Sequence, residues 1–238
     1  MGDTADETHY GYFWFLDPEV TKSPRGLMNL FGAELRASCL SRELREEYRP
    51  LETLSEAYEE LAGKAGYAYT TLSECVRATT YVVLVLWLGR LLHNGDIHTM
   101  AHSLEARVPF SDRELLALAE TVAPKVGFAG GEEKALLRKA LRPFVPDSVF
   151  DRKKSALPRD PRTGPLYQMA LRTALEEEAE FAKGFFDVDR LLELSAAPQI
   201  SDIERTVLFS ALALLRWQRR YGGGVPTAPA AAVASPDS

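Results

Sequence analysis

The chain has 238 residues, of which 46% are hydrophobic and 26% charged, the make-up of a soluble globular protein with a sizeable core. Its 34 acidic residues outnumber its 28 Lys and Arg residues, giving a net charge of −6. This balance argues against a general nucleic-acid binder, because phosphate contacts need a basic surplus or a basic face. The longest apolar run, residues 81–88, is far shorter than the about 20 residues that cross a bilayer, so we expect a core helix.

The N-terminal residues and the two cysteines favour a cytoplasmic protein. Residues 1–7 are acidic where a secretory signal would be basic and then apolar. Cys39 and Cys75 have no Cys or His partners at metal-ligand spacing. We therefore predict two reduced, buried thiols, with a disulfide as the minor alternative.

Apolar residues recur at helical spacing through most of the chain, and convincing strands are scarce, which predicts a mainly α fold. Ser73-Glu74 is predicted to cap a helix that is apolar enough to be buried on all sides, and Ser111-Asp112 to cap another. Residues 221–238, rich in Gly, Pro and Ala, are predicted to form a disordered tail after a folded domain over residues 1–220. In chain order, helices are expected over residues 27–40, 41–61, 74–92, 113–122, 132–141, 166–179 and 203–221.

The first candidate site is acidic. Asp3, Asp6 and Glu7 are spaced i, i+3 and i+4, so their carboxylates can converge at a turn or helix start and hold Mg²⁺ bound to phosphates. An acidic, frayed N-terminus is the simpler alternative.

Three further segments carry charges in suggestive settings. Glu105 and Arg107 lie among apolar neighbours, which favours a structural ion pair. Lys134 and Arg138 share a helix face that can meet an anion or simply face solvent. The basic loop 151–159, which contains Lys154, is either a phosphate clamp or ordinary surface.

In their order along the chain, these segments resemble the C-terminal synthetase domain of the glutamine-hydrolysing asparagine synthetase family, which has β-lactam synthetase and lasso-peptide cyclase relatives. The family has G-E-G-x-D-E-x-x-x-G-Y, then D-R-x-x-M-A-x-x-x-E-x-R-x-P-F-L-D, then K-x-x-L-R and R-x-K-x-G-F-x-x-P. This chain has GDTADETHYGY, GDIHTMAHSLEARVPFSD, KALLR and RKKSALP at the corresponding places.

The resemblance implies an ATP-dependent amide-forming ligase, which adenylates a carboxylate and lets ammonia or an amine attack the acyl-adenylate. ATP and Mg²⁺ are the implied cofactors, with Asp6 as the metal and pyrophosphate carboxylate. Lys154 matches the lysine that stabilises charge during adenylation. Asp3 stands where amide-forming relatives carry a Glu that orients the nitrogen nucleophile.

The remaining site residues follow from the same motifs. Gly2, Glu7 and Lys134 fall at positions that the resemblance assigns to ATP or pyrophosphate binding. Glu105 and Arg107 are interpreted as structural support.

The chain departs from the family pattern in several places. Thr4 replaces a glycine of the first motif, Ile97 replaces the Arg of D-R, and Ser111 replaces the Leu of P-F-L-D. The ATP loop S-G-G-x-D-S does not occur in the sequence, and Gly2 stands where the glutaminase domain carries its cysteine. The fold expected by resemblance is therefore the helical C-terminal part of an α/β ATP-pyrophosphatase-type domain, N-terminally truncated and without its parallel sheet and ATP loop.

Three explanations stay open for this departure: a split enzyme whose partner chain carries the ATP loop or the glutaminase, a truncated reading frame, and an inactive binding module. The first two predict an exposed apolar face near residues 74–92. An intramolecular cyclase of the β-lactam synthetase or lasso-peptide type is the alternative activity. The carboxylate substrate, small molecule or peptide, and the nitrogen donor are left open.

Overall fold

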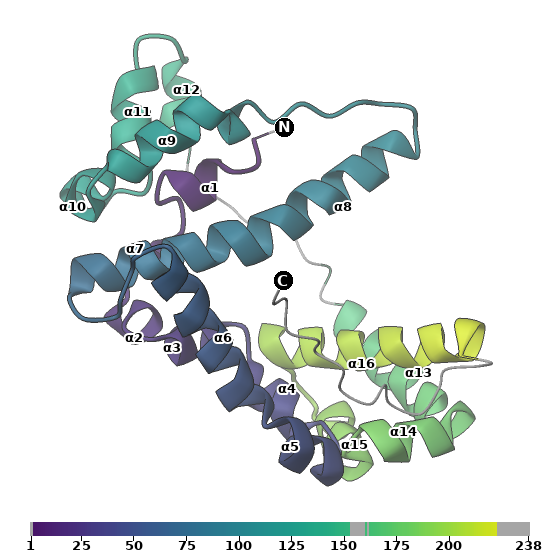
Figure 1. The fold of residues 1–238 in the computed structure, drawn as a ribbon. Coiled ribbons are helices and arrows are strands. Elements are labelled where there is room, and N and C mark those ends of the chain that lie inside the picture. The colour runs from purple at the N-terminus through teal and green to yellow at the C-terminus, as the bar shows by residue number, and fades with distance from the viewer. Residues whose placement is uncertain (1, 153–159, 161, 223–238) are drawn as a thin grey trace, which may run out of the picture. The chain divides into compact units, whose positions relative to one another are not determined.

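The computed structural model describes residues 2–152, 160 and 162–222, and these residues form helices joined by loops (Figure 1). Within this described part the chain forms no β-sheet, and the mainly α prediction is confirmed. One isolated antiparallel bridge joins Leu40 to Phe186. The predicted tail lies outside the described residues from 223 onward.

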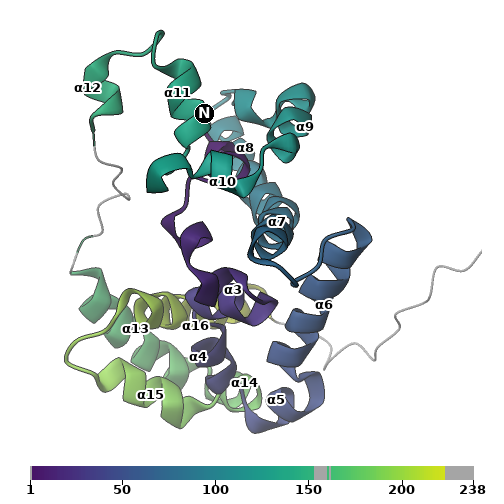
Figure 2. The same cartoon turned by 90° about the vertical axis from the view of Figure 1, so that its left-hand side faces the viewer.

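Backbone contacts divide the chain into two compact units, residues 1–33 with 49–158 and residues 34–48 with 159–238. The α-helices of the first unit are α1 (Ala5–Thr8), α2 (Pro18–Thr21), α3 (Pro24–Leu30), α6 (Pro50–Lys64), α7 (Leu72–Val83), α8 (Gly89–Met100), α9 (Arg113–Thr121), α10 (Pro124–Gly127), α11 (Ala135–Leu141) and α12 (Asp147–Phe150). In this unit α6 packs on α7 (Figures 1 and 2).

The core of the first unit is aromatic at its centre. Tyr10, Trp14 and Phe15 follow α1 and are almost fully buried. The ring of Phe15 contacts those of Tyr10 and Phe128, at centroid distances of 5.9 and 6.3 Å. The buried face of α7, which includes Val82, packs in the same cluster. Burial of the large apolar area of these rings stabilises this unit.

One continuous helix crosses the first unit from Leu72 to Met100 (Figure 1). A π-helical turn, Leu84–Leu88, joins α7 to α8. By length and composition alone the helix could cross a membrane, but the first half of it is a core element of this unit. Thr71 caps it through a capping box with Glu74, so the predicted cap at Ser73 is wrong by two residues.

The second half of this helix corrects the prediction of burial on all sides. Three apolar side chains within residues 74–92 are 43–45% exposed, namely Val85, Leu86 and Leu91. This stretch of the helix therefore presents apolar side chains to solvent.

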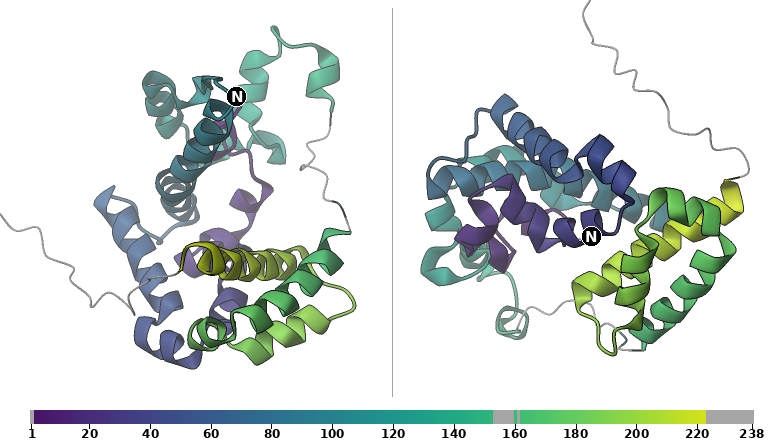
Figure 3. Two further views of the ribbon diagram at one scale, coloured as in Figure 1. Left: turned by 90° about the vertical axis from the view of Figure 1, so that its right-hand side faces the viewer. Right: turned by 90° about the horizontal axis from the view of Figure 1, so that it is seen from below.

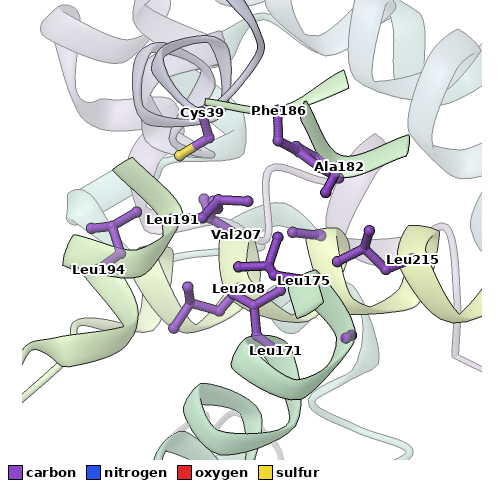
Figure 4. Packing of buried hydrophobic residues seen from close by; sticks show 12 residues of the cluster. Cys39, Leu171, Leu175, Ala182, Phe186, Leu191, Leu194, Val207, Leu208 and Leu215 are labelled. Atoms are coloured by element: carbon purple, nitrogen blue, oxygen red, sulfur yellow. The ribbon is translucent and has the colours of Figure 1, made fainter. Parts of the chain in front are cut away.

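The second unit contains α4 (Ala33–Ser38), α5 (Arg42–Tyr48), α13 (Thr163–Glu177), α14 (Ala179–Phe185), α15 (Val188–Ala196) and α16 (Asp202–Tyr221). In it α13 and α15 pack against α16 (Figure 3). Leu171, Leu191, Leu208 and Leu215 are fully buried between these helices, with Cys39 at the edge of the cluster (Figure 4). This leucine core holds the unit together by apolar burial.

Several predicted helices are interrupted where the backbone turns left-handed. The predicted helix 27–40 breaks at Gly32 (φ 70°), and the helix 41–61 breaks at Arg49 (φ 41°), just before Pro50. The helix predicted from Glu132 begins at Ala135 instead, because Lys134 has φ 55°. A residue with positive φ cannot continue a right-handed helix.

Both cysteines are free and buried, and burial raises the pKa of each thiol. Since the thiolate is the reactive form, we expect Cys39 and Cys75 to react with a thiol reagent at pH 8 much more slowly than in urea. Absorbance at 412 nm with Ellman's reagent, with and without urea, measures this. Fast labelling of two thiols in the native chain would contradict it.

Candidate active site

The candidate site is built around α1, whose two ends are set by left-handed residues. Thr4 precedes the helix with φ 81°, and Tyr10 follows it with φ 57°. Such values are uncommon outside glycine, and for a β-branched residue they mark strain. Between these turns α1 packs against α7, the π-helical turn and α9, all within the first unit.

The turn at Thr4 joins the first acidic motif to the end of the second motif. Thr4 is fully buried, and its hydroxyl shares a hydrogen bond with the hydroxyl of Ser111. The Thr8 hydroxyl donates to the Thr4 carbonyl oxygen over 2.7 Å. The left-handed backbone explains why a glycine suits this place, and the two departures from the family pattern, Thr4 and Ser111, contact each other.

Asp6 and Lys134, far apart in the sequence, form an ion pair. Asp6 Oδ1 lies 2.7 Å from Lys134 Nζ, and both side chains are mostly buried. The backbone N–H of Lys134 donates to the Tyr10 carbonyl oxygen over 3.2 Å, which ties the start of α11 to the end of α1. A methyl group on Gly11 would lie 2.0 Å from Asp6 Oδ1 and 2.3 Å from Lys134 Cε, so only glycine leaves room for the pair.

The other two carboxylates of the acidic motif lie in different settings. Glu7 is buried, and its Oε1 accepts a 2.6 Å hydrogen bond from the Tyr12 hydroxyl. Burial first, and then this hydrogen bond, raise the pKa of Tyr12. The charge of Asp3 acts on Tyr12 in the same direction. Glu7 thus braces the chain after α1, while Asp3 is partly exposed.

The surroundings of His9, which include Lys134 of the ion pair, favour its neutral form. Burial, followed by the positive charge of Lys134, lowers its pKa. Its Nδ1 lies 2.7 Å from the Thr8 hydroxyl oxygen, and its ring meets Phe110 edge-on at 5.9 Å. Because a neutral imidazole adds no charge, the carboxylates and Lys134 determine the net charge of the cluster.

A polar hollow of about 480 Å³ opens beside Lys134. Its walls include Arg138, which pairs with Glu132 at 2.7 Å and donates to the Phe150 carbonyl oxygen at 2.6 Å. Arg138 and Lys134, which were predicted to share an anion-binding face, are thus each paired with a carboxylate of the same unit. Arg152, which precedes the undescribed residues 153–159, also lines this hollow. The predicted catalytic Lys154 lies outside the described residues.

The remaining predicted residues lie apart from the pair. Glu105 and Arg107 form the expected ion pair at 2.9 Å, but the side chains are 65% and 83% exposed, so the expected apolar surroundings are wrong. Such an exposed pair contributes little to stability. Gly2 is exposed.

The donor set around Asp6 fits a magnesium ion that keeps phosphates and waters as most of its ligands. Mg²⁺ in nucleotide sites is bound through one or two carboxylates plus substrate phosphates. Asp6 supplies one such carboxylate, with the cation of Lys134 next to it. Among the described residues no three His, Cys, Asp or Glu side chains gather as an all-protein metal site.

The sequence predicted no site role for three residues that shape this site. Gly11 gives clearance to the ion pair, Tyr12 holds Glu7, and Ser111 meets Thr4. The run Tyr10-Gly11-Tyr12 follows the acidic motif directly, and a glycine between two aromatic residues indicates a close approach of the backbone.

The Thr4–Ser111 contact predicts coupled mutations. Ser111→Leu alone leaves the buried Thr4 hydroxyl unpaired, and Thr4→Gly alone leaves a void, whereas both together let the leucine occupy the space of the threonine. We expect the double variant to be more stable than the sum of the single effects by about 1 kcal/mol. Urea unfolding of the four chains measures this coupling. Thr4→Gly combined with Leu118→Ala, an exposed site on α9, should be additive, and additivity of the test pair would contradict the contact.

Gly11→Ala should lower stability by about 1–3 kcal/mol, because the methyl group would overlap both members of the ion pair and the Asp6 backbone. Thermal unfolding measures the change. Gly63→Ala in α6 is the matched control: nothing lies within 4 Å of its added methyl, so it should stabilise the helix slightly. Equal effects at the two glycines would contradict the close approach.

Comparison with known proteins gives a single family. A family model described as asparagine synthase matches residues 1–219. Asparagine synthetase [glutamine-hydrolyzing] 3 of Bacillus subtilis is 30% identical over 160 residues, which are 66% of this chain and 26% of that protein. Asparagine synthetase [glutamine-hydrolyzing] 1 of the same organism is 40% identical over 79 residues, which are 33% and 12%. Amidase chry2 of Gibberella zeae is 36% identical over 72 residues, which are 28% and 11%.

The aligned segments span about a quarter or less of the length of these relatives. The family match nevertheless covers nearly all of the described residues, including the acidic motif, Ser111 and Lys134. This chain belongs to the asparagine synthase family.

Proposed function

We propose that the chain provides the pyrophosphate side of an ATP-dependent amide-forming ligase. In this reaction a carboxylate oxygen attacks the α-phosphorus of ATP and pyrophosphate leaves. Ammonia or an amine then attacks the acyl carbon, and AMP leaves as the amide forms. The observation that carries the proposal is the half-buried pair of Asp6 and Lys134, which joins two separate family motifs in one site.

The two residues of the pair have complementary roles. The Asp6 carboxylate is placed to hold Mg²⁺ together with phosphate oxygens, and the Lys134 ammonium to contact the departing pyrophosphate. While no phosphate is bound, each neutralises the other at 2.7 Å, which offsets the cost of keeping two charges mostly buried. When magnesium pyrophosphate binds, Asp6 pairs with Mg²⁺ and Lys134 pairs with a phosphate oxygen, in place of pairing with each other.

Two other residues complete the proposed chemistry. Lys154 supplies the positive charge that adenylation needs at the α-phosphate, since charge builds up there as the bond forms. Asp3 orients the nitrogen nucleophile, and its shorter side chain sets a stricter requirement on distance than a glutamate would. The ATP loop S-G-G-x-D-S, which these 238 residues do not contain, comes from a polypeptide segment outside them.

The test is carboxylate-dependent ATP–pyrophosphate exchange by the chain in complex with the polypeptide segment that carries the loop. Lys154→Ala and Asp6→Asn should each lower the exchange rate about 100-fold or more, because each removes a charge that faces the phosphates. Lys153→Ala and Asp96→Asn, the latter exposed on α8, are the matched controls and should keep the wild-type rate. A wild-type rate for Lys154→Ala would show that the catalytic assignment is wrong.

Calorimetric titration of Mg-ATP tests whether this chain alone forms the nucleotide site or whether the site needs the ATP loop as well. We expect no micromolar binding by the chain alone and micromolar binding by the complex. Micromolar binding by the chain alone would contradict the role given to the ATP loop.

A further inference from the structure

A second cavity lies in the first unit, on the side of α1 that carries Thr8. Its volume is about 260 Å³, and α1, α7 with the π-helical turn, and α9 provide its walls. Asp6 and Thr8 are two positions apart, so they project from nearly opposite sides of α1. The Asp6–Lys134 pair does not line this cavity.

The walls are aromatic and aliphatic. The rings of Tyr67 and Tyr81 pack at a centroid distance of 5.8 Å, and Tyr10 joins them. Leu84, Leu88 and Leu116 add aliphatic surface, and the polar residues Thr8, Arg77, Thr80 and Glu120 also line the cavity. Such a lining takes up an apolar ligand by excluding water from both surfaces.

Hydrogen bonds hold the three walls in place. The Arg77 guanidinium on α7 donates to the carbonyl oxygens of Glu120 and Val122 at the end of α9, over 2.8 and 3.4 Å. The Tyr10 hydroxyl donates to the same Val122 oxygen over 3.1 Å. The cavity is therefore preformed, which lowers the entropy cost of ligand binding.

Two further features indicate a ligand site. The wall formed by Leu84, Val85 and Leu88 is the π-helical turn, and such turns are rare and frequently found at functional sites. Tyr67 and Tyr81 line the cavity, and each carries a hydroxyl that can form a hydrogen bond with a polar group of a ligand. Val85 and Glu120 are exposed and mark the opening of the cavity.

We propose that this cavity binds a small, uncharged aromatic molecule or group with one hydrogen-bonding atom, of about the size of indole. The volume supports this size: an apolar cavity of about 150 Å³ holds benzene, whereas drug-sized ligands need about 300 Å³ or more. The proposal does not depend on the ATP chemistry, because its ligand lies on a different side of α1.

The experiment is a ¹⁹F NMR titration of 5-fluoroindole with the full chain, without nucleotide. We expect a saturable shift with a Kd at or below about 1 mM. Val85→Trp should fill the opening and abolish the shift. Leu86→Trp, at the next residue with nearly the same exposure but outside the cavity, should bind as the wild type does.

Two further sets of variants keep the result interpretable. Tyr67→Phe with Tyr81→Phe should weaken binding about 3- to 10-fold through the lost hydroxyls. If Val85→Trp does not fold by circular dichroism, Leu116→Trp replaces it, with the exposed Leu118→Trp as its control. No saturable shift with the wild type, or equal binding by the filling variant and its control, would overturn the proposal.

Discussion

The geometry of the candidate site depends on one backbone hydrogen bond, from Lys134 N–H to the Tyr10 carbonyl oxygen. Both residues have positive φ, so each ends a segment at the point where the two segments meet. This contact places the side chain of Lys134 beside Asp6. Gly11, which has no side chain, leaves the space that the two side chains need. Strain in two backbone residues is thus retained where it brings opposite charges from two motifs together.

The departures from the family pattern have different meanings once their positions are known. Thr4 and Ser111 replace a glycine and a leucine, and counted separately they suggest two losses. Their hydroxyls form one hydrogen bond, so the two replacements act as a pair that keeps the turn before α1 filled and satisfied. A reader of the sequence alone has no way to see this pairing, because the residues are far apart along the chain.

Local patterns in the sequence predicted the helical content, the Asp112 cap and the long C-terminal helix, because periodicity and capping residues act over a few positions. The break at Arg49 has a local signal, because Pro50 follows it and the residue before a proline disfavours the helical region. The break at Lys134, a residue other than glycine with positive φ, has no such signal. For the site, the acidic motif led to Asp6 and the resemblance to Lys134. The ion pair between them joins residues far apart in the sequence through the contact between Lys134 and Tyr10, and it has no local signal.

Apolar neighbours in the sequence also overstated burial. The exposed Glu105–Arg107 pair and the exposed Leu86 both lie in strongly apolar stretches. Composition reports what a segment can bury, whereas the arrangement of neighbouring helices decides which face is covered.

The π-helical turn Leu84–Leu88 sets the two halves of the long helix out of phase. A turn of this kind holds one residue more than an α-helical turn, and one residue corresponds to about 100° of rotation. The side chains of α8 are therefore rotated about the common axis relative to the faces that α7 presents. The buried faces of α7 pack in the aromatic core, whereas none of the residues of α8 is buried, so the change of phase falls where the helix leaves the core.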